Sequence, residues 1–164
     1  MKLIQLAVLL SALLCSLVAG LVLTFAIVVM PGIRTLGERD FLKSFKAIDR
    51  VIQNNQPIFM LIWLGSALLL LTSTMLGFWH LEGLDRVLLT IACAIYLFGV
   101  HVPTVMINTP LNNELQSQYL DTMTEAAVHE ATERFEPRWL LWNAIRTVIA
   151  IVTTVLLLVL LIRL

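Results

Sequence analysis

The sequence predicts an all-α fold, a four-helix transmembrane bundle with up-down-up-down topology, and two observations predict it. Of the 164 residues, 59% are hydrophobic and only 13% are charged, which is unlike a soluble domain. Four apolar runs are each long enough to cross about 30 Å of hydrocarbon as a helix. We therefore expect a single membrane domain over residues 1–164, with spans at 3–30, 58–79, 87–107 and 139–162.

The first apolar run begins like a secretory signal, with Lys2 ahead of it, but it is too long for one. A signal core has about 7–15 apolar residues, whereas this run continues to Met30 without a convincing cleavage site. We expect a retained span. Cys15 and Cys93 both fall inside predicted spans and have no metal-binding spacing, so they are interpreted as packing residues.

Charge distribution indicates how the chain is oriented. The formal net charge is zero, which argues against a nucleic-acid partner. The two long polar stretches, residues 31–57 and 108–138, fall on one side of a four-span bundle and carry most of the Lys and Arg. By the positive-inside rule we expect a cell-membrane protein with these stretches in the cytoplasm and both termini opposite. The cations compared are Arg34, Arg39, Lys43, Lys46, Arg50, Arg134 and Arg138 against Lys2, Arg86 and Arg163.

The first long stretch contains an amphipathic helix. Its apolar side consists of Phe41, Phe45, Ile48 and Ile52, with Lys43, Lys46 and Arg50 opposite. This pattern predicts an interfacial helix on the membrane surface. Asp49 and Gln53 lie on its flank, and two interpretations stay open: solvation by headgroups, or contact with polar groups of the second long stretch.

The second long stretch is also predicted to be helical, with Thr122 and Glu125 spaced as a capping box. Glu125, His129 and Glu133 share one face, but the segment is highly charged and reads as a solvated helix. We expect no metal site there.

The third apolar run ends with a polar stripe in which His101, Thr104 and Asn108 share one helical face. Pro103 removes a backbone hydrogen bond and predicts a kink close to His101. Pro110 disfavours continuation of the helix, which leaves the position of Asn112 open.

The fourth run contains Arg146 about two turns inside the apolar sequence. An arginine at mid-membrane costs roughly 2.5–3.5 kcal/mol on insertion scales, so it usually faces a partner or a wet cavity. One third of the helix circumference is polar or small, and this face is expected to turn toward the bundle. Trp139 and Trp142 are each interpreted either as an interface anchor or as part of this face. The face comprises Trp139, Trp142, Asn143, Arg146, Ala150, Thr153 and Thr154.

The two polar stripes are predicted to lie at the same depth in the membrane. His101 and Arg146 each lie on the order of 10 Å below the same surface, at 1.5 Å per residue. The prediction is a polar pocket open to the long-stretch side, with Arg146 at its floor. The alternative is a structural clamp, in which Arg146 snorkels or binds loose carbonyls at the kink. The other predicted members of the pocket are Asn108, Asn143, Asp49, Gln53 and Asn112.

Several separated motifs resemble those of one family. They are Pro31-Gly32-Ile33, the segment from Phe45 to Asn54 containing Ala47-Ile48-Asp49-Arg50, Val102-Pro103-Thr104 with Asn108-Thr109-Pro110-Leu111-Asn112, and the segment from Trp139 to Thr147. Together they resemble the anthrone oxygenase-like family of small integral membrane proteins, much of which is catalogued only as a domain of unknown function. The resemblance covers nearly the whole chain. Lys46 and His101 depart from it, since glutamine is usual at both positions.

The resemblance implies a four-helix membrane protein and, as for a few fungal members, oxidation of an anthrone to an anthraquinone by molecular oxygen without an obvious cofactor. It points to Asp49, Asn108, Asn112, Trp142, Asn143 and Arg146, without assigning catalytic roles. Combined with the predicted pocket, it suggests a cofactor-independent oxygenase for an aromatic or polyketide-like hydrophobic substrate.

In that interpretation His101 or Asp49 is the base and Arg146 stabilises the substrate anion. Substrate binding is expected from Asn108, Asn112, Trp142, Asn143 and Gln53. We expect the lipid bilayer and a small hydrophobic aromatic ligand as partners, and no metal or other cofactor. The alternative is a non-enzymatic membrane module that binds a lipid or small hydrophobic ligand or supports a partner complex.

Overall fold

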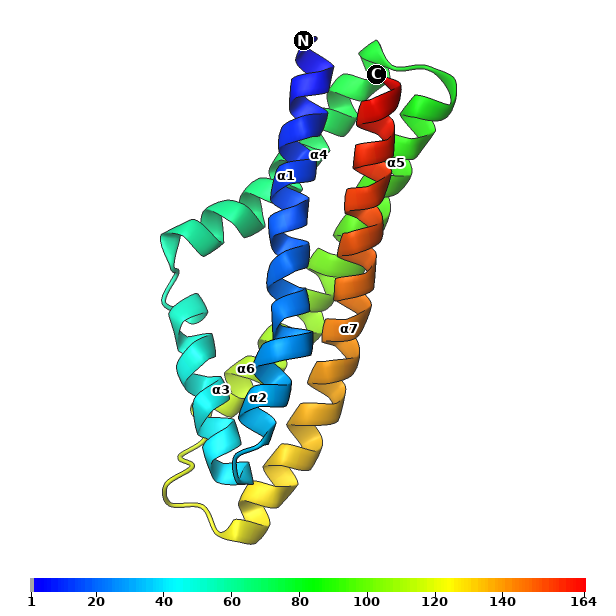
Figure 1. Cartoon of the computed structure of the whole chain (residues 1–164). Coiled ribbons are helices and arrows are strands. Elements are labelled where there is room, and N and C mark those ends of the chain that lie inside the picture. Colours follow the sequence, from blue (N-terminus) through cyan, green and yellow to red (C-terminus); the bar gives the residue numbers. More distant parts are fainter. Residues whose placement is uncertain (1) are drawn as a thin grey trace.

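A computed structural model describes residues 2–164, and these residues form helices without any strand (Figure 1). The first long helix is made of α1 (Leu3–Thr24), the π-helical segment η1 (Phe25–Val29) and α2 (Met30–Arg34). It is followed by α3 (Glu38–Gln53) and α4 (Pro57–His80). The third long helix consists of α5 (Gly83–Tyr96), the π-helical segments η2 (Leu97–His101) and η3 (Thr104–Asn108), and α6 (Thr109–Ser117). The last helix is α7 (Glu125–Arg163).

Within residues 2–164, four helices are long and apolar enough to cross a membrane, which confirms the predicted all-α bundle. The chain runs up and down, and both ends of the chain lie at the same end of the bundle (Figure 1). At the opposite end the helices continue well past the predicted spans. The 39 residues of α7 extend about 58 Å, roughly twice the hydrocarbon thickness. Most of the second long stretch is therefore a continuation of membrane helices.

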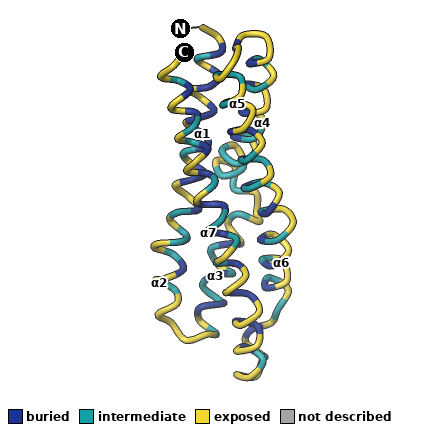
Figure 2. The backbone as a smooth tube through the Cα atoms, turned by 90° about the vertical axis from the view of Figure 1, so that its right-hand side faces the viewer, coloured by how far each residue is buried: buried dark blue, intermediate teal, exposed yellow. Residues whose placement is uncertain are grey.

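Most buried apolar residues form two clusters. Buried positions occur along the whole length of the bundle (Figure 2). The membrane cluster joins α1, α4, α5 and α7 around residues such as Val8, Leu70 and Leu157. The second cluster joins α3, α6 and the first half of α7 around Phe45, Leu115 and other apolar side chains. The projecting helix ends thus have a core of their own.

The amphipathic helix α3 is present, and protein covers its most apolar residues. The side chains of Phe41 and Phe45 are buried in the second cluster. The Phe45 ring contacts Phe135 and Trp139 of α7 with centroid separations of 4.7 and 5.2 Å. Because α7 extends beyond the predicted span, it offers an apolar partner that the sequence-based placement on the membrane surface did not include.

Three prolines are accommodated by π-helical turns. Pro31, Pro103 and Pro110 each stand two residues after such a segment, η1, η2 and η3 respectively. In each segment a backbone N–H bonds to the carbonyl five residues earlier, as Thr109 does with Thr104. This wider turn lets the chain pass the missing proline N–H. The predicted end of the helix at Pro110 is wrong, because the helix continues into α6, which includes Asn112.

Candidate functional site

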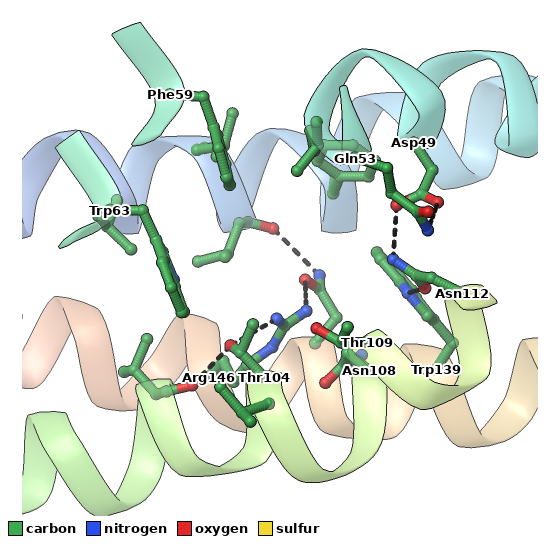
Figure 3. A pocket seen from close by; sticks show the side chains of 18 of the residues that line it. Asp49, Gln53, Phe59, Trp63, Thr104, Asn108, Thr109, Asn112, Trp139 and Arg146 are labelled. Carbon is green, nitrogen blue, oxygen red and sulfur yellow. Dashed lines mark hydrogen bonds between the residues drawn. The ribbon is translucent and has the colours of Figure 1, made fainter. Parts of the chain in front are cut away.

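A cavity of about 350 Å³ lies where the two apolar clusters meet. It is bounded by α1 and η1, the end of α3, the first turns of α4, the end of η2, η3, the start of α6, and α7 (Figure 3). Figure 1 shows the beginning of α4 leaning away from the rest of the bundle, and its first turns contribute Phe59, Met60 and Trp63 to the cavity wall. The volume is at the lower end of the range for small-molecule pockets, and the wall is mainly apolar with a few convergent polar groups. These properties suit a small hydrophobic ligand with polar substituents.

Arg146 supplies the positive charge of the cavity and is only 7% exposed. Its Nη1 donates a hydrogen bond to Thr104 Oγ1 at 2.9 Å, and its Nη2 donates to Asn143 Oδ1 at 3.0 Å. The Nε atom is buried without a partner. Among residues 2–164, no carboxylate forms a salt bridge with Arg146. Neutral oxygens orient the guanidinium, and its charge is left available to an anion.

The two oxygens that hold Arg146 are themselves fixed. Thr104 Oγ1 donates to the Val100 carbonyl at 2.6 Å, so its lone pairs face the guanidinium. Asn143 Nδ2 donates to the Val22 carbonyl of α1 at 3.1 Å. The guanidinium is thus preorganised by α1, η3 and α7 together, which is the arrangement expected of a site that stabilises developing charge.

Asp49 lies at the α3 side of the cavity and is only 3% exposed. Its Oδ1 accepts a hydrogen bond from Asn112 Nδ2 at 2.7 Å. Its Oδ2 accepts from Gln53 Nε2 at 2.7 Å and from Gln116 Nε2 at 2.9 Å. Of the two interpretations of this flank residue, contact with the second long stretch is therefore the one observed. Three amides satisfy three acceptor positions, and a carboxylate offers about four.

Trp139 lines the cavity and connects its two charged groups. The indole Nε1 donates to Asn112 Oδ1 at 3.0 Å, and the ring lies 5.9 Å from the Arg146 guanidinium carbon. The side chain is 4% exposed, which places it inside the bundle rather than at the membrane interface. Trp142, the tryptophan chosen from the sequence, is half-buried and does not line the cavity. Trp139 and Arg146 are seven residues apart and therefore share a helical face, so the sequence could have identified Trp139 as a cavity residue.

Asn108 also lines the cavity, and it differs from the other amides. It is 2% exposed, and both Oδ1 and Nδ2 are buried without a hydrogen-bond partner. Most buried polar atoms in folded proteins are paired, so such a residue calls for an explanation.

His101 lies beside the cavity rather than in its wall. Its ring packs against Trp63 and Tyr96, with centroid separations of 4.7 and 5.1 Å, and its Nε2 is buried without a partner. The predicted stripe assumed an α-helix, whereas His101 ends a π-helical segment whose turns hold more residues. The angular position of His101 relative to Thr104 is therefore not the predicted one.

Outside the cavity, the charged face around His129 is solvated as expected. His129 Nδ1 bonds to Glu38 Oε1 at 2.8 Å, and both side chains are exposed. Within residues 2–164 no group of three or more His, Cys, Asp or Glu side chains is arranged to hold a metal ion.

The fold and cavity define a class: a four-helix membrane protein with a mainly apolar cavity that contains an arginine. The chain belongs to the anthrone oxygenase family, because it matches the family described as Anthrone oxygenase over residues 49–156, well over half of its length. That range runs from the end of α3 through most of α7 and includes both Asp49 and Arg146. No curated protein and no solved structure matches the chain.

Proposed function

We propose that the protein is a cofactor-independent oxygenase that acts on an acidic, electron-rich aromatic substrate taken up from the membrane. The observation that supports this most is the buried guanidinium of Arg146, which faces the cavity and has no carboxylate partner among residues 2–164. A desolvated, unpaired cation in an apolar cavity favours a ligand that is an anion or becomes one during reaction. The family description adds the class of reaction.

For an anthrone-like substrate the reaction balances with molecular oxygen as the sole oxidant. The methylene carbon loses a proton to a base, and the resulting enolate passes an electron to oxygen to give a substrate radical and superoxide. These two combine to form a carbon–oxygen bond, which yields a hydroperoxide after protonation. Loss of water then leaves a new carbonyl group. One oxygen atom enters the product, and the other leaves as water with the two methylene hydrogens.

Two residues of the cavity have the chemistry that this sequence requires. The Asp49 carboxylate has an acceptor position not used by its three amide donors and is assigned as the proton acceptor. Arg146 is assigned to bind the enolate oxygen and stabilise its negative charge. His101 was the other candidate base, but its ring is packed between Trp63 and Tyr96, beside the cavity. We therefore assign no proton transfer to it.

Oxygen uptake tests this function directly. Full-length protein in mild detergent is mixed with a hydroxyanthrone, and the rate of spontaneous oxidation without protein is subtracted. We expect Arg146→Met to lower the catalysed rate by about 10²–10³, the usual effect of removing one oxyanion donor. The control is Arg138→Met, which removes an exposed arginine from the same helix. An unchanged rate in folded Arg146→Met protein rejects the assignment.

The alternative is a membrane module that binds a lipid or hydrophobic ligand without reaction, and the mainly apolar cavity wall favours it. Mass spectrometry of protein purified in mild detergent distinguishes the two. A retained lipid or aromatic compound, together with the absence of catalysed oxygen uptake, supports the binding module.

We also propose that the bilayer is the cell membrane and that α3 and α6 face the cytoplasm. The excess of Lys and Arg in the long polar stretches supports this orientation. A reporter active only in the cytoplasm is expected to be inactive at the C-terminus and active when inserted between α6 and α7. The reverse result rejects this orientation.

A further inference from the structure

We propose that Asn108 selects the substrate by binding it through both amide atoms, and that the preferred ligand carries two neighbouring oxygen substituents on its aromatic ring, at least one of them a hydroxyl. This inference rests on the proposed function in taking the ligand to be aromatic and to be bound by Arg146. It is carried by one cavity-lining amide whose donor and acceptor are both buried without a hydrogen-bond partner.

The position of Asn108 is fixed by the backbone around it. It ends the π-helical segment η3 and lies between Pro103 and Pro110. Thr104, at the start of the same segment, accepts the hydrogen bond from Arg146. The two side chains both line the cavity, and Figure 3 shows Asn108 and Arg146 on the same side of it. A ligand held by Arg146 therefore lies in the same cavity that Asn108 lines.

A purely structural role does not account for this side chain. Other buried amides of the site are engaged, as Asn143 is with Val22 and Arg146. Asn108 precedes α6 but its side chain makes no capping hydrogen bond. A buried polar atom without a partner costs stability, so an apolar side chain of similar size would serve packing better. The cost is understandable if a ligand supplies the two missing hydrogen bonds.

The pattern of the amide defines the ligand chemistry. Oδ1 only accepts and Nδ2 only donates, and the two atoms lie side by side. Their complement is an adjacent donor and acceptor. Two neighbouring oxygen substituents provide this, because one hydroxyl donates to Oδ1 while the other oxygen accepts from Nδ2. A single hydroxyl can reach both atoms only through two bent, weaker hydrogen bonds, whereas two neighbouring oxygens allow two nearly linear ones. The difference in affinity between ligands with one and with two oxygen substituents should therefore depend on Asn108.

Binding of two anthraquinones tests the proposal without turnover. Titrations of full-length protein with 2,3-dihydroxyanthraquinone and 2-hydroxyanthraquinone are followed by quenching of tryptophan fluorescence, since Trp139 and Trp63 line the cavity. We expect the dihydroxy compound to bind about tenfold more tightly to the unaltered protein. In Asn108→Leu the ratio of the two dissociation constants should fall to near one. Asn113→Leu, which removes an exposed amide from α6, should retain the ratio.

Thermal unfolding separates ligand selection from structure. Because Leu removes two unsatisfied buried atoms, the midpoint of Asn108→Leu without ligand should be no lower than that of the unaltered protein. If Asn108→Leu fails to fold, Asn108→Thr replaces it, since a threonine hydroxyl bonds back to its own helix and cannot bind both ligand oxygens. An unaltered protein without the tenfold preference, or a folded Asn108 variant that retains it, overturns the proposal. If the preference for the dihydroxy compound is present but the protein catalyses no oxygen uptake, only the proposed oxygenase activity is rejected.

Discussion

Trp139 donates a hydrogen bond from its indole nitrogen to Asn112 Oδ1 at 3.0 Å, and this contact links the two charged groups of the cavity. Asn112 in turn donates to Asp49, while the Trp139 ring lies near the Arg146 guanidinium. A single side chain of α7 therefore influences both the position of the carboxylate on α3 and the surroundings of the cation. The proposed base and the proposed anion stabiliser are held by one connected set of contacts.

Replacing Trp139 by Phe should weaken that connection while keeping an aromatic ring in place. The lost hydrogen bond is worth about 1 kcal/mol of stability, and Asn112 becomes free to rotate away from Asp49. We expect oxygen uptake to fall about tenfold. The matched control is Trp142→Phe, a change at a half-buried tryptophan outside the cavity wall, which should leave the rate nearly unchanged. Equal rates in the two variants would argue against a positioning role for Trp139.

The choice between the two candidate bases is tested by a pair of substitutions. Asp49→Asn keeps the shape of the side chain but removes its ability to take a proton, so the catalysed rate should fall about 10²-fold or more. His101→Phe keeps the ring stacking with Trp63 and Tyr96, and the rate should stay within about twofold. Steady-state oxygen uptake measures both. Loss of activity in His101→Phe with retention in Asp49→Asn would reverse the assignment.

Close packing of η2 against α7 depends on Gly99. A Cβ atom there would lie 2.4 Å from Ile149 Cδ1. Gly99→Ala should therefore destabilise the bundle by about 1–3 kcal/mol, the usual cost of overpacking. Unfolding midpoints in detergent measure the effect, and adding Ile149→Val should recover part of it. Gly20→Ala is the control, because nothing lies within 4 Å of its Cβ position and stability should not fall.

The exposed pair of His129 and Glu38 provides a prediction about pH. The hydrogen bond and charge of Glu38 raise the pKa of His129 above its usual value of about 6.5. Since the folded pKa lies above the unfolded one, the pair stabilises the fold fully below about pH 6.5, and this contribution is lost as the pH rises through the raised value. NMR titration of the imidazole should show the higher pKa, and Glu38→Gln should return it toward 6.5. An identical titration in both proteins would refute the contact.

Asn108, Asn143 and Arg146 were predictable because they stand out against apolar spans, whereas Asp49 and Gln53 were found on the flank of the amphipathic helix α3. Asp49, Gln53, Asn108, Asn112 and Asn143 were all named from the sequence, and all line the cavity with Arg146. A polar side chain in a span must face the bundle, so its direction follows from its chemistry.

The apolar wall was not predictable in the same way. Phe59 and Trp63 belong to α4, which is apolar on every side, so no periodic contrast shows which residues face inward. The misplaced stripe at His101 and the continuation through Pro110 have a common origin. Both depend on π-helical turns, which sequence periodicity based on α-helices does not anticipate.

The most direct test of the account is the ionisation of a phenolic ligand in the cavity. A hydroxyanthraquinone changes colour when it loses its proton, so its absorbance can be titrated in the bound state. If Arg146 binds the anion, the pKa of the bound phenol should be about one to three pH units lower in the unaltered protein than in Arg146→Met. Arg138→Met should behave like the unaltered protein. The same bound pKa in all three would contradict the claim that Arg146 stabilises a ligand anion.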